Sequence, residues 1–294
     1  MPELPDIVAY LEGLERRVVG RELLGLRLTS PFLVRSVEPP IGTLVGRRVV
    51  GVSRLGKRLV LDFGDELFLV IHLMIAGRLR WRPPGGKAPG RGTLATFEFG
   101  DGLLVFTEAG TKRRASFTVV RGRDALHAID RGGLEVLGAS VAEFAARLRS
   151  ENHTLKRALT DPRLFSGIGN AYSDEILHHA RLSPLLTTAR LGDAQCERLW
   201  ASTRTVLEGW IARFRDEVGD GFPETVTAFR EGMAVHGRYG QPCPDCGAPV
   251  QRIRYAENET NYCARCQTEG RLLADRSLSR LLKGDWPRSI DELE

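Results

Sequence analysis

The sequence predicts an α+β protein in which an N-terminal helix and a β-sandwich precede a helical domain and a small module that contains cysteines. Three observations support this expectation. Apolar residues recur at helical spacing over residues 6–19, short apolar runs broken by glycine fill residues 23–120, and helical spacing returns beyond residue 138. Many short strands are typical of a sandwich or barrel, and the change of period along the chain favours two domains.

Length and composition indicate a globular chain with a basic character. Its 294 residues are 42% hydrophobic and 27% charged, which is enough to bury a sizeable core. The net charge of +5 and the pI of about 9.1 favour a polyanionic partner. The expected parts are a β-sandwich domain at 1–125, a helical domain at 135–235, a cysteine module at 238–272 and a C-terminal extension at 273–294.

Nothing in the sequence indicates membrane insertion or export. No run of about 18 apolar residues occurs, and the first residues lack the basic segment and apolar core of a signal peptide. We therefore expect a cytoplasmic protein with no membrane partner.

The first half of the chain is expected to form one helix followed by short strands. The helix covers residues 6–19 and ends at Gly20. Its apolar positions recur at intervals of three and four, at Ile7, Leu11, Leu14 and Val18. Strands are expected at residues 26–28, 49–52, 59–63, 67–71, 93–99, 103–106 and 117–120. The glycine-bearing pieces 64–65 and 100–102 are typical of hairpin turns, and the stretch 83–92 is too rich in proline and glycine for a regular element.

The second half is expected to be mainly helical. The clearest helical periods cover residues 141–149, 152–160 and 191–215, and Cys196 in the last of these should be a buried small apolar residue. A further short helix is expected at residues 276–283, within the extension.

The first residues suggest a nucleophile. Removal of Met1 would leave Pro2 with a free secondary amine, and Glu3 supplies a neighbouring carboxylate. A secondary amine that attacks an aldehyde-like carbon gives an iminium ion, which is a strong electron sink. Most chains that begin with Met-Pro have no such function, so the remaining motifs must support this hypothesis.

Four cysteines near the end of the chain form the strongest local motif. Cys243 and Cys246 form one C-x-x-C pair, and Cys263 and Cys266 form a second pair after sixteen intervening residues. Two such pairs place four thiolates around one Zn²⁺. A site with four thiolates has no open position, so the zinc ion is expected to be structural. The segment 250–255 between the pairs is typical of a strand of a β-hairpin.

The segment 161–177 is the second motif, because it joins two helices through a turn that contains glycine. Gly167 lets the backbone turn sharply, and Asn170 is expected to cap the following helix. The exposed amides at a helix start suit a phosphate, although a simple turn between packed helices is the plain alternative. The neighbouring His178 and His179 are expected on the helix surface.

Taken together, these motifs resemble the formamidopyrimidine-DNA glycosylase / endonuclease VIII family of base-excision repair enzymes. The resemblance runs nearly end to end. It rests on the Pro-Glu-Leu-Pro start, Gly56-Lys57, His72-Leu73 before a turn, the Gly-Ile-Gly-Asn segment that ends at Asn170, and the four-cysteine finger. It implies a helix-two-turns-helix motif in the helical domain and a β-hairpin zinc finger with one structural Zn²⁺.

The resemblance implies a bifunctional DNA glycosylase and abasic-site lyase that excises damaged bases from double-stranded DNA. The Pro2 amine would attack C1′ of the damaged nucleoside, and Glu3 would protonate the sugar ring oxygen. Lys57 would bind a phosphate next to the lesion. β-Elimination, usually followed by δ-elimination, would then cleave the strand. Asn170 and Arg271 would bind flanking phosphates, with Gly167 in the same motif and Lys156 as a weaker candidate. The implied partner is damaged DNA near the nucleoid, bound by a monomer.

Two departures from the family pattern concern the choice of lesion. Met74 or Ile75 could wedge into the base stack, but an aromatic expected on a later loop is replaced by Ala115, which leaves Arg113 and Arg114 to fill the space. The second departure is Asp6, which is one methylene shorter than the usual glutamate. His72 belongs to the implied DNA-binding set, whereas without the family it would be interpreted as a core histidine and Lys57 as a solvated strand lysine.

The altered loop leaves two alternatives open. One is a module that binds kinked, gapped or abasic DNA without excising bases. The other is an enzyme restricted to lyase action or to unusual lesions. Base release measured separately from strand cleavage distinguishes them from a full glycosylase.

Overall fold

The computed structural model divides the chain into two compact units. Unit 1 contains Met1–Arg131 and Trp210–Thr227, and unit 2 contains Gly132–Gly209 and Ala228–Glu294. The structure describes residues 1–86, 90, 92–109, 113–224, 226, 229–255, 258–274 and 287–293. Each unit is described by itself.

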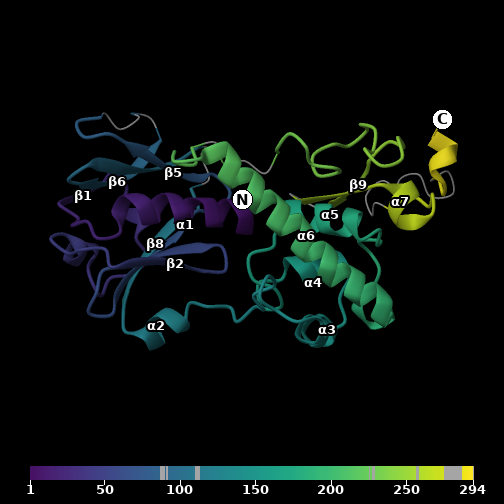
Figure 1. Ribbon diagram of the computed structural model, residues 1–294, viewed down its shortest axis with the longest axis horizontal. Helices are drawn as coiled ribbons and strands as arrows, with labels where there is room; N and C mark the ends of the chain where they lie inside the picture. Colours follow the sequence, from purple (N-terminus) through teal and green to yellow (C-terminus); the bar gives the residue numbers. More distant parts are fainter. Residues whose placement is uncertain are drawn as a thin grey trace. The chain divides into compact units, whose positions relative to one another are not determined.

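Unit 1 is a β-sandwich with a helix at its start, as the sequence predicts (Figure 1). After α1 (Leu4–Val18), one antiparallel sheet has the order β1 (Gly25–Leu28), β6 (Thr93–Phe99), β7 (Gly102–Glu108) and β5 (Gly77–Arg82). The other has the order β2 (Gly51–Leu55), β3 (Arg58–Asp62), β4 (Leu67–His72) and β8 (Ser116–Arg121). Two 3₁₀ turns, η1 (Pro31–Leu33) and η2 (Ile41–Leu44), and the short helix α2 (Arg123–His127) complete the unit.

The strand β5 was not expected from the sequence. It is an edge strand that pairs only with β7. Arginines alternate along it with Leu79 and Trp81, so one of its faces is strongly charged. Because the strand has no long apolar run, the sequence pattern did not indicate it. Trp81 packs against Phe99 with ring centroids 6.2 Å apart.

The core of unit 1 joins both sheets to α1. Phe117 lies between Phe97 and Phe106, at centroid distances of 5.6 and 5.0 Å, and all three rings are buried. From α1, Tyr10 and Leu14 are fully buried in the same cluster. Burial of each such side chain contributes roughly 1.5–3 kcal/mol, so α1 is held firmly by its apolar stripe.

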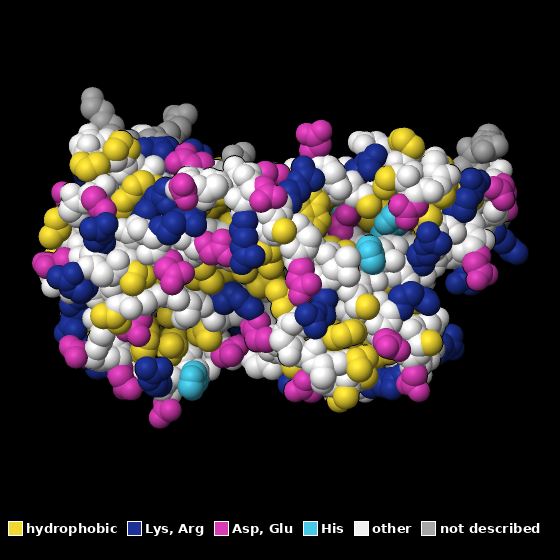
Figure 2. All heavy atoms as spheres, in the orientation of Figure 1, with side chains coloured by type: hydrophobic (Ala, Val, Ile, Leu, Met, Phe, Trp, Pro, Cys, Tyr) yellow, Lys and Arg dark blue, Asp and Glu magenta, His cyan; other side chains and the backbone are white. Residues whose placement is uncertain are grey.

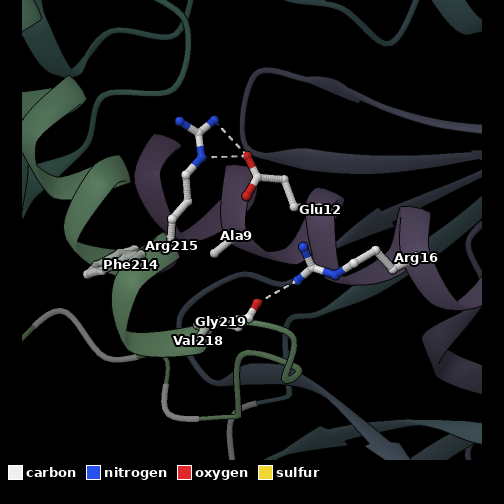
Figure 3. A pocket seen from close by; sticks show the side chains of 7 residues that line it. All are labelled: Ala9, Glu12, Arg16, Phe214, Arg215, Val218 and Gly219. Carbon is white, nitrogen blue, oxygen red and sulfur yellow. Dashed lines mark hydrogen bonds and ion pairs between the residues drawn. The ribbon is translucent and has the colours of Figure 1, made fainter.

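The end of the long helix α6 (Asp193–Val218) also holds α1. A small cavity of about 220 Å³ lies where the two meet, lined by Ala9, Glu12, Arg16, Phe214, Arg215, Val218 and Gly219 (Figure 3). Arg215 donates two hydrogen bonds to Glu12, at 2.7 and 2.9 Å, and Arg16 donates to the Gly219 carbonyl at 3.1 Å. Because these groups satisfy one another, we assign no ligand to the cavity.

Unit 2 combines helices with one hairpin. Its helices are α3 (Val141–Arg149), α4 (Leu155–Thr160), α5 (Asn170–His179), the first part of α6, and α7 (Ala264–Thr268), with the 3₁₀ turns η3 (Thr188–Arg190) and η5 (Ile290–Leu293). The hairpin pairs β9 (Gln251–Tyr255) with β10 (Asn258–Tyr262). α4 starts later than expected because Thr154 caps it, accepting a hydrogen bond from the Arg157 N–H. Cys196 is buried in α6, as predicted.

The last described residues return to the hairpin module. The Leu272 N–H donates to the Arg288 carbonyl at 2.9 Å, and the Ile290 N–H donates to the Gly270 carbonyl at 2.8 Å. Ile290 is only 4% exposed and joins Leu272 and Leu273 in the core around the cysteines. The helix expected at 276–283 lies outside the described residues.

Charge on the visible face is mixed. Lys and Arg side chains, in dark blue, alternate with Asp and Glu side chains, in magenta (Figure 2). The net charge of +5 is therefore not collected into one patch on that face. Within the described part of the chain, no helix has the length and apolar character that a bilayer crossing demands.

Candidate active site

The start of the chain is buried at the first turn of α1. Pro2 is buried, and Glu3 and Asp6 are each 3% exposed. The Glu3 N–H donates to the Asp6 carboxylate at 2.9 Å. This bond satisfies one of the free amides of a helix start and fixes the backbone next to Pro2. The shorter carboxylate of Asp6 therefore still reaches the terminus, where it holds Glu3 in place.

The α-amino group of Met1, one residue before Pro2, has a lowered pKa. Burial is the largest cause, because it penalises the charged ammonium form. The carboxylates of Glu3 and Asp6 oppose the shift, whereas the cations of Arg78 and Lys57 add to it. Pro2 is buried at the same place, so an amine released there by loss of Met1 is subject to the same kind of desolvation, which favours its uncharged, nucleophilic form.

Lys57 lies in a tight turn rather than within a strand. Gly56 and Lys57 form the two-residue connection of the β2–β3 hairpin, and Gly56 has a φ of +59°, which suits glycine at the first turn position. The Lys57 side chain is largely removed from solvent, so burial lowers its pKa, with the Glu3 carboxylate opposing and Arg58 adding to the shift. The turn thus brings a cation close to Glu3.

His72 ends β4 directly opposite Arg58 in the ladder. Burial lowers its pKa to about 4, and the positive charges of Arg58, Lys57 and Arg131 act in the same direction. His72 is therefore neutral at physiological pH. Three cations around one neutral imidazole form a positive region next to the terminus, which suits an anionic ligand such as a phosphate.

The turn between β4 and β5 presents one apolar side chain. Ile75 is 60% exposed, whereas Met74 is half-buried in the left-handed region at a φ of +52°. Gly77 closes the turn by donating to the Leu73 carbonyl at 2.9 Å, and a Cβ there would lie 2.3 Å from that oxygen. The turn therefore requires glycine at position 77 and holds Ile75 outward.

Arg113 and Arg114 are exposed at the start of the segment that leads into β8. The N–H groups of Arg114 and Ala115 donate to one oxygen of the buried Glu108 carboxylate, at 2.8 and 3.1 Å. Glu108 thereby anchors this end of the loop, while Ala115 itself is 3% exposed. The loop residues 110–112 lie outside the described part of the chain.

In unit 2, the turn between α4 and α5 differs from the expectation in one respect. Gly167 has a φ of +82°, as a sharp turn requires, but the residue that caps α5 is Gly169. Asn170 is the first helical residue, so its predicted role as the cap was wrong. Its side-chain amide donates to the Glu259 carbonyl of the hairpin at 2.8 Å.

Lys156 has an internal partner. Its ammonium donates to the Asp174 carboxylate at 2.5 Å and to the Asn170 carbonyl at 2.7 Å, and its side chain is 12% exposed. Asp174 also contacts His236 Nδ1 at 2.8 Å. Lys156 therefore holds the start of α5.

Sequence reasoning missed a carboxylate that organises unit 2. Glu175 is 6% exposed and accepts hydrogen bonds from the N–H groups of Ala234, Val235 and His236 at 2.7, 3.0 and 2.9 Å. Burial raises the pKa of Glu175, while these N–H groups act in the opposite direction. In the sequence, an acidic residue close to a helix start is explained by local electrostatics alone, and local spacing gives no sign of partners some 60 residues away.

The four cysteines lie together as predicted. Sγ of Cys243 is 3.9 Å from Sγ of Cys266, and Sγ of Cys246 is 3.4 Å from Sγ of Cys263. A tetrahedral Zn²⁺ with bonds of about 2.3 Å to each sulfur separates the sulfurs by roughly 3.8 Å, so the donor set fits zinc.

His178 is not on the helix surface, contrary to expectation. It is 3% exposed, and its Nε2 lies 3.3 Å from Cys243 Sγ, since α5 is buried on almost every side. As a neighbour of a metal-bound thiolate, Nε2 must carry the hydrogen and donate it. His179 instead contacts the Ser202 hydroxyl at 2.9 Å.

Arg271 lies just past α7 with its side chain exposed. Its backbone N–H donates to the Thr268 carbonyl at 3.0 Å, and it forms a β-bridge with Ser289. The returning segment 287–293 thus fixes the backbone from which this cation projects.

Family models match the chain in three places. The formamidopyrimidine-DNA glycosylase N-terminal domain matches residues 1–115, the H2TH domain of the same enzymes matches residues 136–219, and the zinc finger found in FPG and IleRS matches residues 240–268. The chain belongs to the formamidopyrimidine-DNA glycosylase family. Its finger holds one structural Zn²⁺.

Relatives agree over nearly the whole length. The formamidopyrimidine-DNA glycosylase of Heliobacterium modesticaldum is 35% identical over 281 residues, which cover 91% of this chain and all of the relative. That of Acidovorax sp. is 32% identical over 284 residues, covering 91% and 99%.

Solved structures of the family superpose closely. A MutM complex with DNA containing carbocyclic 8-oxo-G has a TM-score of 0.80 at 26% identity and covers 91% of this chain and all of that one. The Lactococcus lactis enzyme bound to Fapy-dG DNA has a TM-score of 0.78 at 26% identity, covering 90% and 100%. The protein is therefore a DNA-repair glycosylase of the formamidopyrimidine-DNA glycosylase family, and its partner is DNA.

Proposed function

We propose that the protein excises damaged bases and cleaves the strand through a Schiff base on Pro2. The observation that carries the proposal is the buried terminus: Pro2 and Glu3 are buried, the Lys57 cation lies near Glu3, and burial already lowers the pKa of the Met1 amino group that precedes Pro2. Met1 must first be removed, because an amide nitrogen has no nucleophilic lone pair. The small side chain of Pro2 is the kind that permits this removal.

The proposed reaction replaces the base by the amine at C1′ and then opens the sugar. The Pro2 amine forms a bond to C1′ while the bond from C1′ to the base breaks, and the base leaves with the electron pair. The Glu3 carboxylate takes the proton of the attacking amine and gives it to the ring oxygen, so that the bond from C1′ to this oxygen breaks, the sugar opens and an iminium ion remains. Loss of a C2′ proton then expels the 3′ phosphate, and a second elimination expels the 5′ phosphate.

The proposed DNA contacts come from both units. In unit 1, Lys57 and His72 receive phosphate next to the lesion, supported by the surrounding cations. The exposed Ile75 enters the stack with Met74 beneath it, and Arg113 and Arg114 fill the remaining space. In unit 2, Gly167, Asn170 and Arg271 present flanking phosphate contacts, and Lys156 acts indirectly by holding the start of α5.

The partner we propose is damaged double-stranded DNA, bound by a monomer in the cytoplasm close to the nucleoid and without a membrane. The pI of about 9.1 supports such a partner. We assign the nucleophile to a domain at 1–125, phosphate binding to domains at 135–235 and 238–272, and no separate activity to the extension at 273–294.

Reductive trapping tests the mechanism. With sodium cyanoborohydride and a duplex containing one abasic site, we expect a covalent adduct at Pro2, with intact mass showing that Met1 has been lost. Pro2→Gly should slow adduct formation at least tenfold, and Glu3→Gln should impair base release more than trapping. An adduct unaffected by Pro2→Gly, or full retention of Met1 in active protein, would contradict the proposal.

A lyase without base excision is the second candidate, because the position of the expected aromatic is occupied by the buried Ala115. Base release and strand cleavage should be measured separately on a panel of oxidised bases. Cleavage at abasic sites with no release of any base would favour this restricted activity.

A further inference from the structure

Arg78, at the start of the edge strand β5, binds three backbone carbonyls. Its Nε donates to the Val226 carbonyl at 2.6 Å, and its Nη1 donates to the carbonyls of Ile75 and Gly77 at 3.0 and 2.7 Å. Two of these carbonyls belong to the turn that holds Ile75 outward. The third belongs to the segment that follows α6, so one guanidinium ties the turn to that segment within unit 1.

The charge of the same side chain acts on the terminus. The charged groups that act on the Met1 amino group, directly before Pro2, are Glu3 and Asp6 from the start of the chain, Lys57 from the β2–β3 turn and Arg78 from β5. β5 is also fixed against α1, because the Leu79 N–H donates to the buried Tyr10 hydroxyl at 3.3 Å. The distance between Arg78 and the start of α1 is therefore held by a neighbouring contact.

Arg78 differs from the two other arginines of its strand. Arg80 and Arg82 both pair with the Glu224 carboxylate, at 3.6 and 2.5 Å. Among the described residues, the hydrogen-bond partners of Arg78 are carbonyls, which leave its full positive charge in place. A neutralised arginine would influence the amine much less.

We propose that Arg78 is a positioning residue for the proposed reaction. Its side chain holds the Met74–Ile75 turn and Val226 in fixed positions near the Pro2 amine, and its positive charge acts on that amine. The proposal rests on the proposed role of the terminus. A positive charge there favours the uncharged amine, and a fixed turn places the wedge at a constant distance from the nucleophile.

The test uses the processed full-length protein and measures trapping on a preformed abasic site as a function of pH in single turnovers. In the curve of trapping rate against pH, the rate falls at low pH as the amine becomes protonated; we call this part of the curve the acidic limb. Arg78→Gln should move the acidic limb upward by a few tenths to about one pH unit, because removal of a like charge raises the pKa of the amine. Arg78→Lys keeps the charge and should leave the limb in place. Both variants should lower the plateau rate severalfold, because neither side chain has the two separate nitrogens, Nε and Nη1, that reach Val226 on one side and the turn carbonyls on the other. Arg82→Gln, on the same strand, should change neither quantity by more than about twofold.

The results distinguish a failure of the proposed function from a failure of the proposed role of Arg78. If the wild-type protein forms no adduct, the proposed function falls. If it forms one and Arg78→Gln leaves the acidic limb in place, or Arg82→Gln moves it equally, the role of Arg78 is refuted. Should Arg78→Gln fail to fold, Arg78→Lys decides: a reduced plateau with an unshifted limb supports the role, and a wild-type plateau overturns it.

Discussion

Replacement of Glu175 should expose the amides that it holds, in a pattern set by its two oxygens. Oε1 accepts from the N–H groups of Val235 and His236 at 3.0 and 2.9 Å, and Oε2 accepts from Ala234 at 2.7 Å. In Glu175→Gln, the amide oxygen can keep the first two bonds, but the amide nitrogen then faces the Ala234 N–H, donor against donor. A hydrogen bond to a charged acceptor is worth roughly 1.5–3 kcal/mol.

Amide hydrogen exchange resolves this pattern because 1.4 kcal/mol corresponds to about a tenfold change in protection. We expect Glu175→Gln to speed exchange at Ala234 by about 10- to 100-fold and to spare Val235 and His236. Glu175→Ala should speed exchange at all three amides and should lower the free energy of unfolding by at least about 3 kcal/mol.

Glu208→Gln is the control, because Glu208 forms an exposed pair with Arg204 on the surface of α6 and should cost less than about 0.5 kcal/mol. Equal effects at all three amides in Glu175→Gln would refute the assignment of oxygens. Unchanged exchange in Glu175→Ala would refute the anchor itself.

Three further predictions concern zinc, pH and the returning segment. Native mass spectrometry should find one zinc ion per chain, and Cys263→Ser should release it and weaken duplex binding at least tenfold, because the closed thiolate site contributes folding energy. For His72, the pKa falls from about 6.5 when unfolded to about 4 when folded, so the unfolded chain binds more protons between these values and stability is lost as the pH falls through this window. At pH 5 the loss approaches about 2 kcal/mol, and His72→Gln should remove it from urea denaturation curves measured at pH 7 and 5. Ile290→Ala should lower the local free energy of unfolding by about 2–4 kcal/mol, which is measured as faster hydrogen exchange of the Leu272 amide. Val37→Ala is the control: this side chain is 85% exposed, so the change should leave exchange of the Leu272 amide unaltered.

Features that depend on short spacing could be predicted from the sequence. The helix at residues 141–149 has the bounds of α3, because its apolar period and its Ser140 cap are local. The zinc ligands follow from two C-x-x-C pairs for the same reason. The apolar period likewise predicted a packed helix at residues 6–19, and the helix α1 begins two residues earlier, at Leu4.

Features that depend on distant parts of the chain could not be predicted in this way. His178 looked like surface because a helical period does not reveal that α5 is covered on nearly every side. The pKa of His72 depends on burial and on cations from three separate segments. β5 carries arginines whose partners follow α6, more than 140 residues later, so the segment has no apolar run by which it could be recognised as a strand.

The contact of α6 with α1 has a consequence for the order of events during synthesis. Arg215 and Glu12 are 203 positions apart, so the N-terminal helix leaves the ribosome long before its support exists. Pro2 is buried in the finished fold, as is much of the amino group that precedes it. We therefore expect an aminopeptidase to remove Met1 from the nascent chain, before the terminus packs, and slow processing should leave a fraction of folded protein whose nucleophile is still an amide.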